Sequence, residues 1–138
     1  MNMRTLSLAA LTLLDVPPPE QVRIAAQAGF THVGLRLLPA TPSDPDYAML
    51  GDTPAVRDTL AALMATGVRV SDVEIVRLTP DFALNARLRL FLDTAARLGA
   101  KQVLVAGNDD NRVRSAENLA RLAEAGQEHG LTMNLEPM

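Results

Sequence analysis

A short sequence pattern centred on a glycine repeats four times along the chain and limits the folds that the chain can adopt. The segments "QAGFTHVGL", "ATGVRVSDV", "RLGAKQVLV" and "EHGLTMNL" each end a helix-like stretch at a glycine, pass one apolar residue and enter a β-rich run. Glycine has no Cβ, so it takes the left-handed conformation found just past a helix end at little cost. Gly29, Gly67, Gly99 and Gly130 therefore predict four helix ends, each followed closely by a strand.

The spacing of apolar residues between these glycines is helical. One stripe of apolar residues, three or four positions apart, follows "TPD" and predicts the third helix. That stripe consists of Leu84, Leu88, Phe91, Ala95 and Leu98.

The other helices have recognisable starts. Thr53 followed by Pro54 predicts an N-cap with proline at the first helical position, and Ser115 predicts the start of the last helix. The first helix is expected over residues 20–28, after three prolines. The buried face of the helix after Thr53 is expected to consist of Val56, Leu60, Leu63 and Met64.

Five β-rich runs alternate with these helices, and short strands separated by helices pair in parallel through right-handed crossovers. The glycines recur roughly every 30 to 40 residues, close to the period of a β/α barrel, in which about 250 residues form eight units. The predicted fold class is therefore α/β: a parallel (β/α) barrel of the TIM type, present only as an incomplete barrel of about five strands and four helices, in a single domain over residues 1–138. The expected strands are residues 6–13, 32–37, 68–76, 102–106 and 131–135.

An open, doubly wound sheet is the competing architecture, and periodicity alone does not separate it from a barrel. Such sheets often carry a glycine-rich phosphate loop after the first strand. This chain has "LLDVPPPE" at that position, and its three prolines lack backbone N–H groups. The barrel is favoured for this reason.

Composition excludes several classes of function. The net charge of -3 and the isoelectric point near 5.3 leave no basic field for nucleic acid. The chain has no cysteine, which excludes disulfides and thiolate metal sites and suits a reducing cytoplasm, the expected location. The N-terminal "MRTLSLAALTLL" could be a signal peptide, but no small-residue cleavage site follows it and we interpret it as a buried strand. No run reaches the roughly 20 apolar residues of a membrane span, so no membrane partner is expected.

Polar residues at the ends of the expected strands are the candidates for chemistry, because the active site of a β/α barrel lies at the C-terminal ends of its strands. His32 opens a strand and His129 ends a helix, so both are expected on the far face. The residues at or near the C-terminal ends are Arg36, Glu74, Asn108, Asp109 and Glu136.

Glu136 is the strongest of these candidates. It closes the apolar run "MNL" on a strand that is expected to be buried. Desolvating an ionised carboxylate costs several kcal/mol unless a cation or hydrogen-bond donors compensate it. A divalent metal ion would meet this need; an acid at the rim that contacts water or an arginine is the alternative.

The other candidates, expected to bind substrate, also have structural interpretations. Glu74 interrupts an apolar run, so it points either into the barrel mouth or at a basic neighbour, Arg36 or Arg77. Asn108 and Asp109 in "VAGNDDN" could bind substrate hydroxyls, and they are equally good turn formers.

Taken in order, these segments resemble the xylose isomerase-like β/α barrels, a group of sugar phosphate isomerases and epimerases that includes inosose dehydratase, hydroxypyruvate isomerase, tagatose epimerase and endonuclease IV. The segment "LSLAALTLLDVPPPEQVRIAAQAGFTHVGLRL" resembles their first strand, first helix and second strand. "TAARLGAKQVLV" resembles the third helix and fourth strand, and "GLTMNLEPM" the fifth strand. Each motif is loose, and their order is the specific part. The resemblance covers the whole chain but only the first half or so of such a barrel.

The resemblance implies a role for Glu136, because in such enzymes the glutamate that ends the fifth strand is a metal ligand and one of two catalytic carboxylates. The other ligands, an aspartate, a histidine and a second glutamate, come from later strands. This chain alone is therefore expected to be inactive and need not bind a metal. For the intact enzyme the resemblance implies a divalent ion (Mn, Mg, Co or Zn) and proton transfer next to the carbonyl of a sugar or sugar phosphate.

Three other functions stay open. A dehydratase of the inosose type would differ in expelling a hydroxide. An endonuclease IV-like phosphodiesterase would need zinc-binding histidines, and the expected second and third strands end with Arg36 and Glu74 instead. A non-catalytic half-barrel would self-associate through its open edges.

Overall fold

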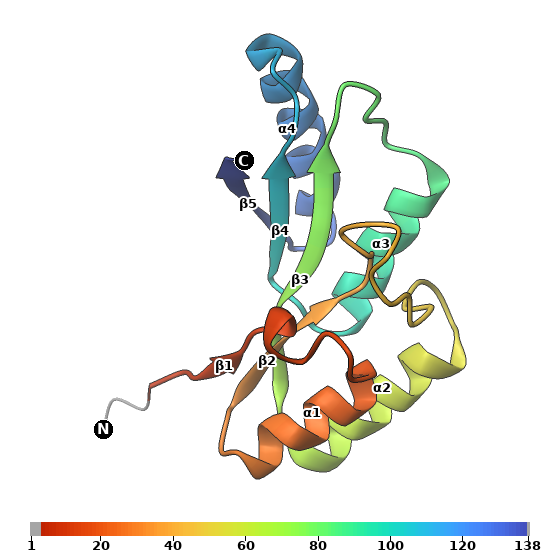
Figure 1. Cartoon of the computed structure of the whole chain (residues 1–138), viewed down its shortest axis with the longest axis vertical. Coiled ribbons are helices and arrows are strands. Elements are labelled where there is room, and N and C mark those ends of the chain that lie inside the picture. The colour runs from red at the N-terminus through yellow and green to blue at the C-terminus, as the bar shows by residue number, and fades with distance from the viewer. Residues whose placement is uncertain (1–3, 138) are drawn as a thin grey trace.

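The computed structural model describes residues 4–137, in which five strands form one sheet beside four α-helices (Figure 1). In chain order the elements are β1 (Ser7–Leu8), the short 3₁₀ helix η1 (Ala10–Leu13), α1 (Pro18–Gln27), β2 (His32–Arg36), α2 (Pro54–Thr66), β3 (Arg69–Leu78), α3 (Ala86–Arg97), β4 (Gln102–Gly107), α4 (Arg112–Gln127) and β5 (Thr132–Pro137).

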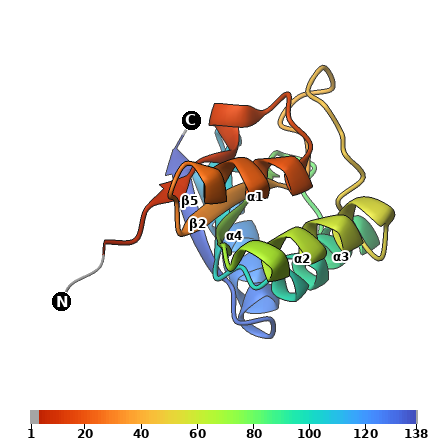
Figure 2. The same ribbon diagram turned by 90° about the horizontal axis from the view of Figure 1, so that it is seen from below.

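The strands are all parallel and lie in the order β1-β2-β3-β4-β5, so each one pairs with its neighbours in the sequence. A doubly wound sheet reverses its strand order at a switch point, and this sheet does not. Connections between neighbouring parallel strands are right-handed crossovers, and each one here leads to the next strand in the same direction across the sheet. All four helices therefore lie on one face of the sheet, as Figures 1 and 2 show. The prediction of an incomplete TIM-type (β/α) barrel is confirmed.

The core lies between the sheet and the helices. Alternate strand residues point to opposite faces, and those on the helix side are fully buried. They are Val33, Leu35, Val73, Val103 and Val105. The four helices cover them with Val22, Val56, Phe91 and Leu122, which are also fully buried. Burying each such side chain contributes about 1.5–3 kcal/mol to folding.

The helix ends follow the sequence prediction. Gly29, Gly67, Gly99 and Gly130 have positive φ angles of 86°, 75°, 83° and 69°. Thr53 caps α2, because its side-chain oxygen accepts a hydrogen bond of 3.2 Å from the backbone N–H of Val56. These short loops deliver the chain directly from each helix into the next strand.

The strand expected over residues 6–13 is wrong for most of its length. Only Ser7 and Leu8 pair with β2, and the chain then turns into the 3₁₀ helix η1. Alanine and leucine favour helical backbone, and a short apolar run has no periodicity that separates a strand from a helix. Leu11, expected inside, is 69% exposed.

Two helix predictions also need correction. Helix α4 starts three residues earlier than Ser115: Asn111 is its N-cap, and the Asn111 side chain accepts from the N–H of Arg114 at 3.0 Å. In α2, Met64 is 89% exposed because the buried face runs through Thr59 and Ala62 instead. The Thr59 hydroxyl is satisfied by donating to the carbonyl of Ala55 at 2.7 Å, which lets a polar residue lie in the core.

Within residues 4–137, no helix is both long enough and apolar enough to cross a membrane.

Candidate functional site

The face of the sheet that no helix covers carries polar side chains. A hollow of about 460 Å³ on this concave face is lined by Ala9, Asp72, Glu74, Gln102, Leu104 and Asn134. Three strands, β3, β4 and β5, contribute to it. In a closed barrel this face is the interior, so its C-terminal rim is the position at which an active site is expected.

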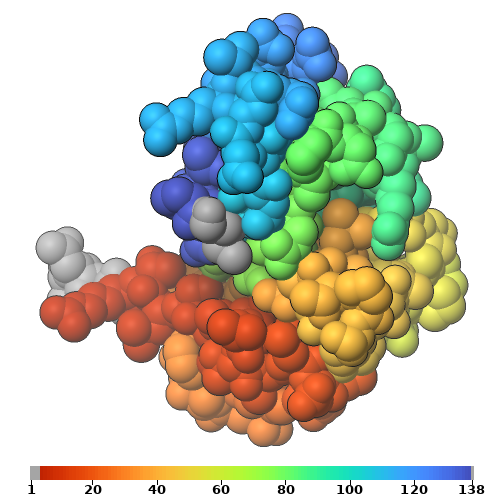
Figure 3. All heavy atoms as spheres, turned by 45° about the horizontal axis from the view of Figure 1, so that its top comes forward, coloured from red at the N-terminus to blue at the C-terminus, as the bar shows by residue number. Residues whose placement is uncertain are grey.

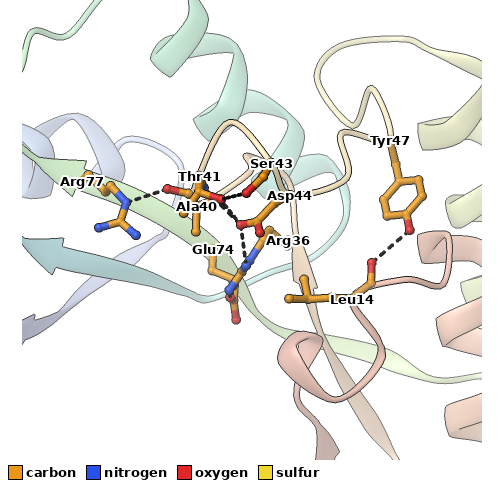
Figure 4. A network of polar contacts seen from close by, with 9 residues as sticks. All are labelled: Leu14, Arg36, Ala40, Thr41, Ser43, Asp44, Tyr47, Glu74 and Arg77. Carbon is orange, nitrogen blue, oxygen red and sulfur yellow. Dashed lines mark hydrogen bonds and ion pairs between the residues drawn. The ribbon is translucent and has the colours of Figure 1, made fainter.

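Glu74 and Arg36 form an ion pair across β2 and β3, where they are directly opposite in register. The Glu74 carboxylate accepts from Arg36 Nε at 2.9 Å and from Nη2 at 2.5 Å, and the two side chains are only 8% and 13% exposed. Of the two arginines considered as partners, Glu74 takes Arg36. Asp44 holds the other side of the guanidinium, with its carboxylate 3.4 Å from Arg36 Nη1 (Figure 4). This arrangement fixes the loop after β2 to the sheet.

Asp44 also organises that loop directly. Its carboxylate accepts from the backbone N–H groups of Ala40 at 3.1 Å and Thr41 at 3.0 Å. The loop is thus tied to Arg36 at the point where β2 ends, at the C-terminal edge of the sheet.

Arg77 connects three strand ends. Its Nε donates to the carbonyl of Ala40 at 2.9 Å (Figure 4), and its Nη1 donates to the side-chain oxygen of Asn108 at 2.8 Å. Ala40 follows β2, Arg77 lies near the end of β3, and Asn108 follows β4. The amide oxygen of Asn108, expected to bind substrate hydroxyls, is therefore already held by a guanidinium.

Asp109 is tied to its own loop. Arg114 donates to it twice, from Nε at 2.6 Å and Nη2 at 2.8 Å, and the N–H of Asn111 donates at 2.9 Å. The Asp109 side chain is 1% exposed. The hydrogen bonds from Arg114 hold the pKa of the Asp109 carboxyl below its usual range, so this group is an anion that closes the start of α4.

Glu136 lies at the end of β5, opposite Ala106 of β4. The expectation of a buried strand is wrong: four of the last five residues of β5 are exposed, Glu136 among them. Within the part of the chain that the structure describes, β5 is an edge strand with one neighbour, so its outer side meets solvent.

Glu136 and Glu74 share the concave face but do not form a pair. Glu136 lies two residues beyond Asn134, which lines the hollow. The side chains of Asn134 and Glu136 therefore point to the same, concave face. Glu74 lies level with Leu104 and Asn134, with β4 between. Strand spacing and rise give roughly 12 Å between the Cα atoms of the two glutamates.

The histidines lie at the other end of the sheet. His32 opens β2, and its Nδ1 is 2.8 Å from the hydroxyl of Thr31. His129 follows α4, with Nε2 2.6 Å from the Asp93 carboxylate and Nδ1 3.2 Å from the Ala125 carbonyl. The hydrogen bond to Asp93, and after it the one to Ala125, raise the pKa of His129.

Sequence reasoning missed three residues of this region: Asp44, Asp72 and Arg77. The sequence predicts that the third strand ends at Val76, so it presents Arg77 only as a possible partner of Glu74; the strand in fact extends to Leu78. A strand two residues longer would have placed Arg77 among the candidates by the rule that selected Arg36. Asp72 lies two residues before Glu74 in β3, so the alternation of side chains along a strand places both on the same face of the sheet. Nothing in the sequence indicates the contact between Asp44 and Arg36, which depends on how the loop folds.

A complete metal site is not found in residues 4–137, where no three histidine, aspartate or glutamate side chains come close enough to hold an ion. Glu136 offers one exposed carboxylate on the concave face. The described residues therefore supply at most part of a ligand set for a divalent ion.

These features define a class of fold, an open part of a (β/α) barrel with its polar face at the strand ends. At the level of sequence, the chain matches no family model and no curated protein. Its fold is that of solved barrels: it superposes on a xylose isomerase domain containing protein from Salmonella typhimurium LT2 with a TM-score of 0.72 and 15% identity, over 100% of this chain and 52% of that one.

Two further solved structures match in the same way. The IOLI protein, solved with a binding zinc atom, gives a TM-score of 0.70 at 14% identity, over 98% of this chain and 52% of its own. A sugar phosphate isomerase/epimerase from Parabacteroides distasonis gives 0.64 at 19% identity, over 99% and 52%. This chain spans about half the length of the solved structures that it matches.

Proposed function

We propose that the chain provides part of the active site of a metal-dependent isomerase or epimerase, with a small sugar or sugar phosphate as substrate. The observation that carries the proposal is the position of Glu136: it ends β5 on the concave face, at the edge where β/α barrels place their active sites. The solved sugar phosphate isomerase/epimerase of the same fold supports this reaction class.

In the proposed reaction Glu136 acts as the base. Its exposed carboxylate removes the proton from the carbon next to the substrate carbonyl, and the electrons of that C–H bond move toward the carbonyl oxygen. Return of the proton to the neighbouring carbon, while the hydroxyl proton of the first carbon moves to the former carbonyl oxygen, gives the isomer. The epimer instead needs a proton on the opposite face of the first carbon, delivered by a second acid on that side. A divalent ion bound nearby would polarise that carbonyl.

Glu136 fits such an ion as one ligand only. Magnesium and manganese prefer six oxygen or nitrogen ligands, so most of the set has to come from groups other than residues 4–137. The zinc atom in the IOLI structure supports a divalent ion as the cofactor.

A survey of activity tests this proposal. The product of the whole gene would be loaded with manganese and incubated with aldoses, ketoses and their phosphates, and products would be identified by NMR. We expect a new isomer or epimer from at least one sugar, lost on chelation and restored by the metal. Loss of water from the substrate would instead indicate the dehydratase. A metal-loaded protein that converts none of these sugars would contradict the proposal.

A second candidate is a half-barrel that associates with a copy of itself. The exposed edge strand β5, with Leu135 45% exposed beside Glu136, favours it. Unpaired backbone groups on an edge strand are a template for pairing with another chain.

A further inference from the structure

Two cavities open beside the candidate site, between the loop after β2 and the loop after β3. They measure about 250 and 440 Å³ and share the side chains of Leu38, Ile75, Arg77 and Arg87. Figure 3 shows this side of the molecule, with the loop after β2 in orange-yellow and the segment that ends β3 in green. The two cavities are therefore neighbours, and both arginines lie in the walls of both.

Arg77 is fixed in place but not neutralised. Its two hydrogen bonds go to neutral oxygens, the carbonyl of Ala40 and the side-chain amide of Asn108. Among residues 4–137, no carboxylate oxygen lies within 4.0 Å of a nitrogen of Arg77 or Arg87. Arg36, one strand away, is paired with Glu74. A half-buried guanidinium with no carboxylate within ion-pair distance, beside a cavity, favours an anion that enters from outside.

We propose that Arg77 and Arg87 form an anion site that takes the phosphate or carboxylate group of a small ligand. A guanidinium presents parallel N–H donors that match the oxygens of either group. Arg77 is already held through Nε and Nη1, so binding costs less side-chain entropy than for a free arginine. Arg87 lies on the first turn of α3, at the rim of the same cavities.

The carboxylates in the cavity walls restrict the ligand further. Asp44 is engaged by Arg36, Asp81 accepts from the hydroxyl of Thr79 at 2.6 Å, and Asp46 accepts from the N–H of Ala48 at 2.9 Å. Their remaining lone pairs can accept hydroxyl donors and repel a second anionic group. The site therefore suits a hydroxylated molecule with one anionic group. The inference that the ligand carries hydroxyl groups rests on the proposed function, whereas the inference that it carries an anionic group does not.

NMR titration of the ¹⁵N-labelled 138-residue chain tests the site. Inorganic phosphate is added with a chelator present and at constant ionic strength, and the Nε–Hε signals of Arg77 and Arg87 are followed. We expect saturable shifts of both signals. Arg77→Gln and Arg87→Gln should each weaken phosphate binding by about fivefold or more, because each removes a charge-assisted donor group. Acetate in a parallel titration shows whether the site prefers phosphate or carboxylate, and saturable binding of either supports it.

Arg69→Gln is the matched control, because Arg69 is exposed at the opposite end of β3. It should leave the affinity unchanged. If Arg77→Gln loses the dispersed spectrum of a folded protein, Arg87→Gln decides the question. Absence of saturable shifts with both ions, or equal weakening by Arg69→Gln, would overturn the proposal. Since no metal is present and Glu136 is intact, this failure is separate from a failure of the proposed reaction.

Discussion

At the scale of single residues, the Arg36–Glu74 pair has unequal partners. Arg36 also contacts Asp44, whereas Glu74 has only Arg36 among its side-chain partners within residues 4–137. Arg36→Met leaves a buried carboxylate without a cation, and we expect a loss of about 3–5 kcal/mol in the free energy of unfolding. Glu74→Gln should cost less, about 1–3 kcal/mol, because Asp44 remains.

Urea denaturation of both variants measures this asymmetry. The control is Arg23→Gln, which breaks a pair with Glu20 whose side chains are 50% and 53% exposed, and it should cost under about 1 kcal/mol. Equal losses for the two buried variants would show that Asp44 does not compensate.

His129 predicts a pH dependence at the opposite end of the sheet. Its pKa is raised above the ordinary 6.5 mainly by the hydrogen bond to Asp93. The charged form is therefore favoured in the folded state, so this contribution is fully present below pH 6.5 and is lost as the pH rises through the folded-state pKa. Because the Asp93 side chain is 66% exposed, solvent screening limits the effect to under about 1 kcal/mol.

NMR titration of the His129 ring in the wild type and in Asp93→Asn provides the measurement. The substitution should lower the His129 pKa, and the difference in stability between the two proteins should disappear at alkaline pH. An unchanged His129 pKa in Asp93→Asn would rule out the contact.

At the scale of elements, two substitutions test which residue caps the start of α4. Asn111→Ala removes the acceptor for the N–H of Arg114 and should cost about 1 kcal/mol of stability. Ser115→Ala should have an effect near zero, because Ser115 lies inside the helix and its N–H already bonds to the carbonyl of Asn111 at 2.9 Å. Thermal unfolding of both variants tests the assignment; a larger loss for Ser115→Ala would restore the start predicted from the sequence.

The elements that sequence predicts best are those set by local chemistry. Thr53, Gly67 and the other helix-ending glycines act through their own backbone, so a single sequence contains the signal. The wrong prediction of a strand at η1 has another cause. An apolar residue such as Leu11 is compatible with a strand or a helix, and only pairing with β2 decides which of the two forms. The exposure of Met64 likewise depends on where α2 meets its neighbours.

The candidate site was predictable to the extent that it follows strand ends. Arg36 and Glu136 could be placed on one edge because parallel strands present their C-terminal ends together. Glu74 was predicted near that edge but lies four residues before the end of β3, because the strand runs on to Leu78. The partner of Asp109 and the role of Asn108 could not, because each depends on the path of a loop that brings in Arg114 or Arg77.

At the scale of the whole molecule, the open sheet predicts association. Strands β1 and β5 each have one neighbour in residues 4–137, and the hollow of the concave face is open to solvent. We expect sedimentation velocity to show concentration-dependent self-association of this chain. A substitution to lysine on the exposed β5, Leu135→Lys, should weaken it, whereas Val113→Lys on α4, at a residue that is 69% exposed, should not. A monomer at all concentrations would contradict the expectation.

Exchange of a substrate proton with solvent tests the central claim, that Glu136 is the base of a proton-transfer enzyme. The product of the whole gene, loaded with manganese in D₂O, should incorporate deuterium at the carbon next to the carbonyl of its sugar substrate. Glu136→Gln should slow this exchange by about 10²–10⁴-fold, because an amide of nearly the same shape cannot accept the proton. Glu117→Gln, on an exposed face of α4, should keep the wild-type rate. Exchange at the wild-type rate in folded Glu136→Gln would contradict the account.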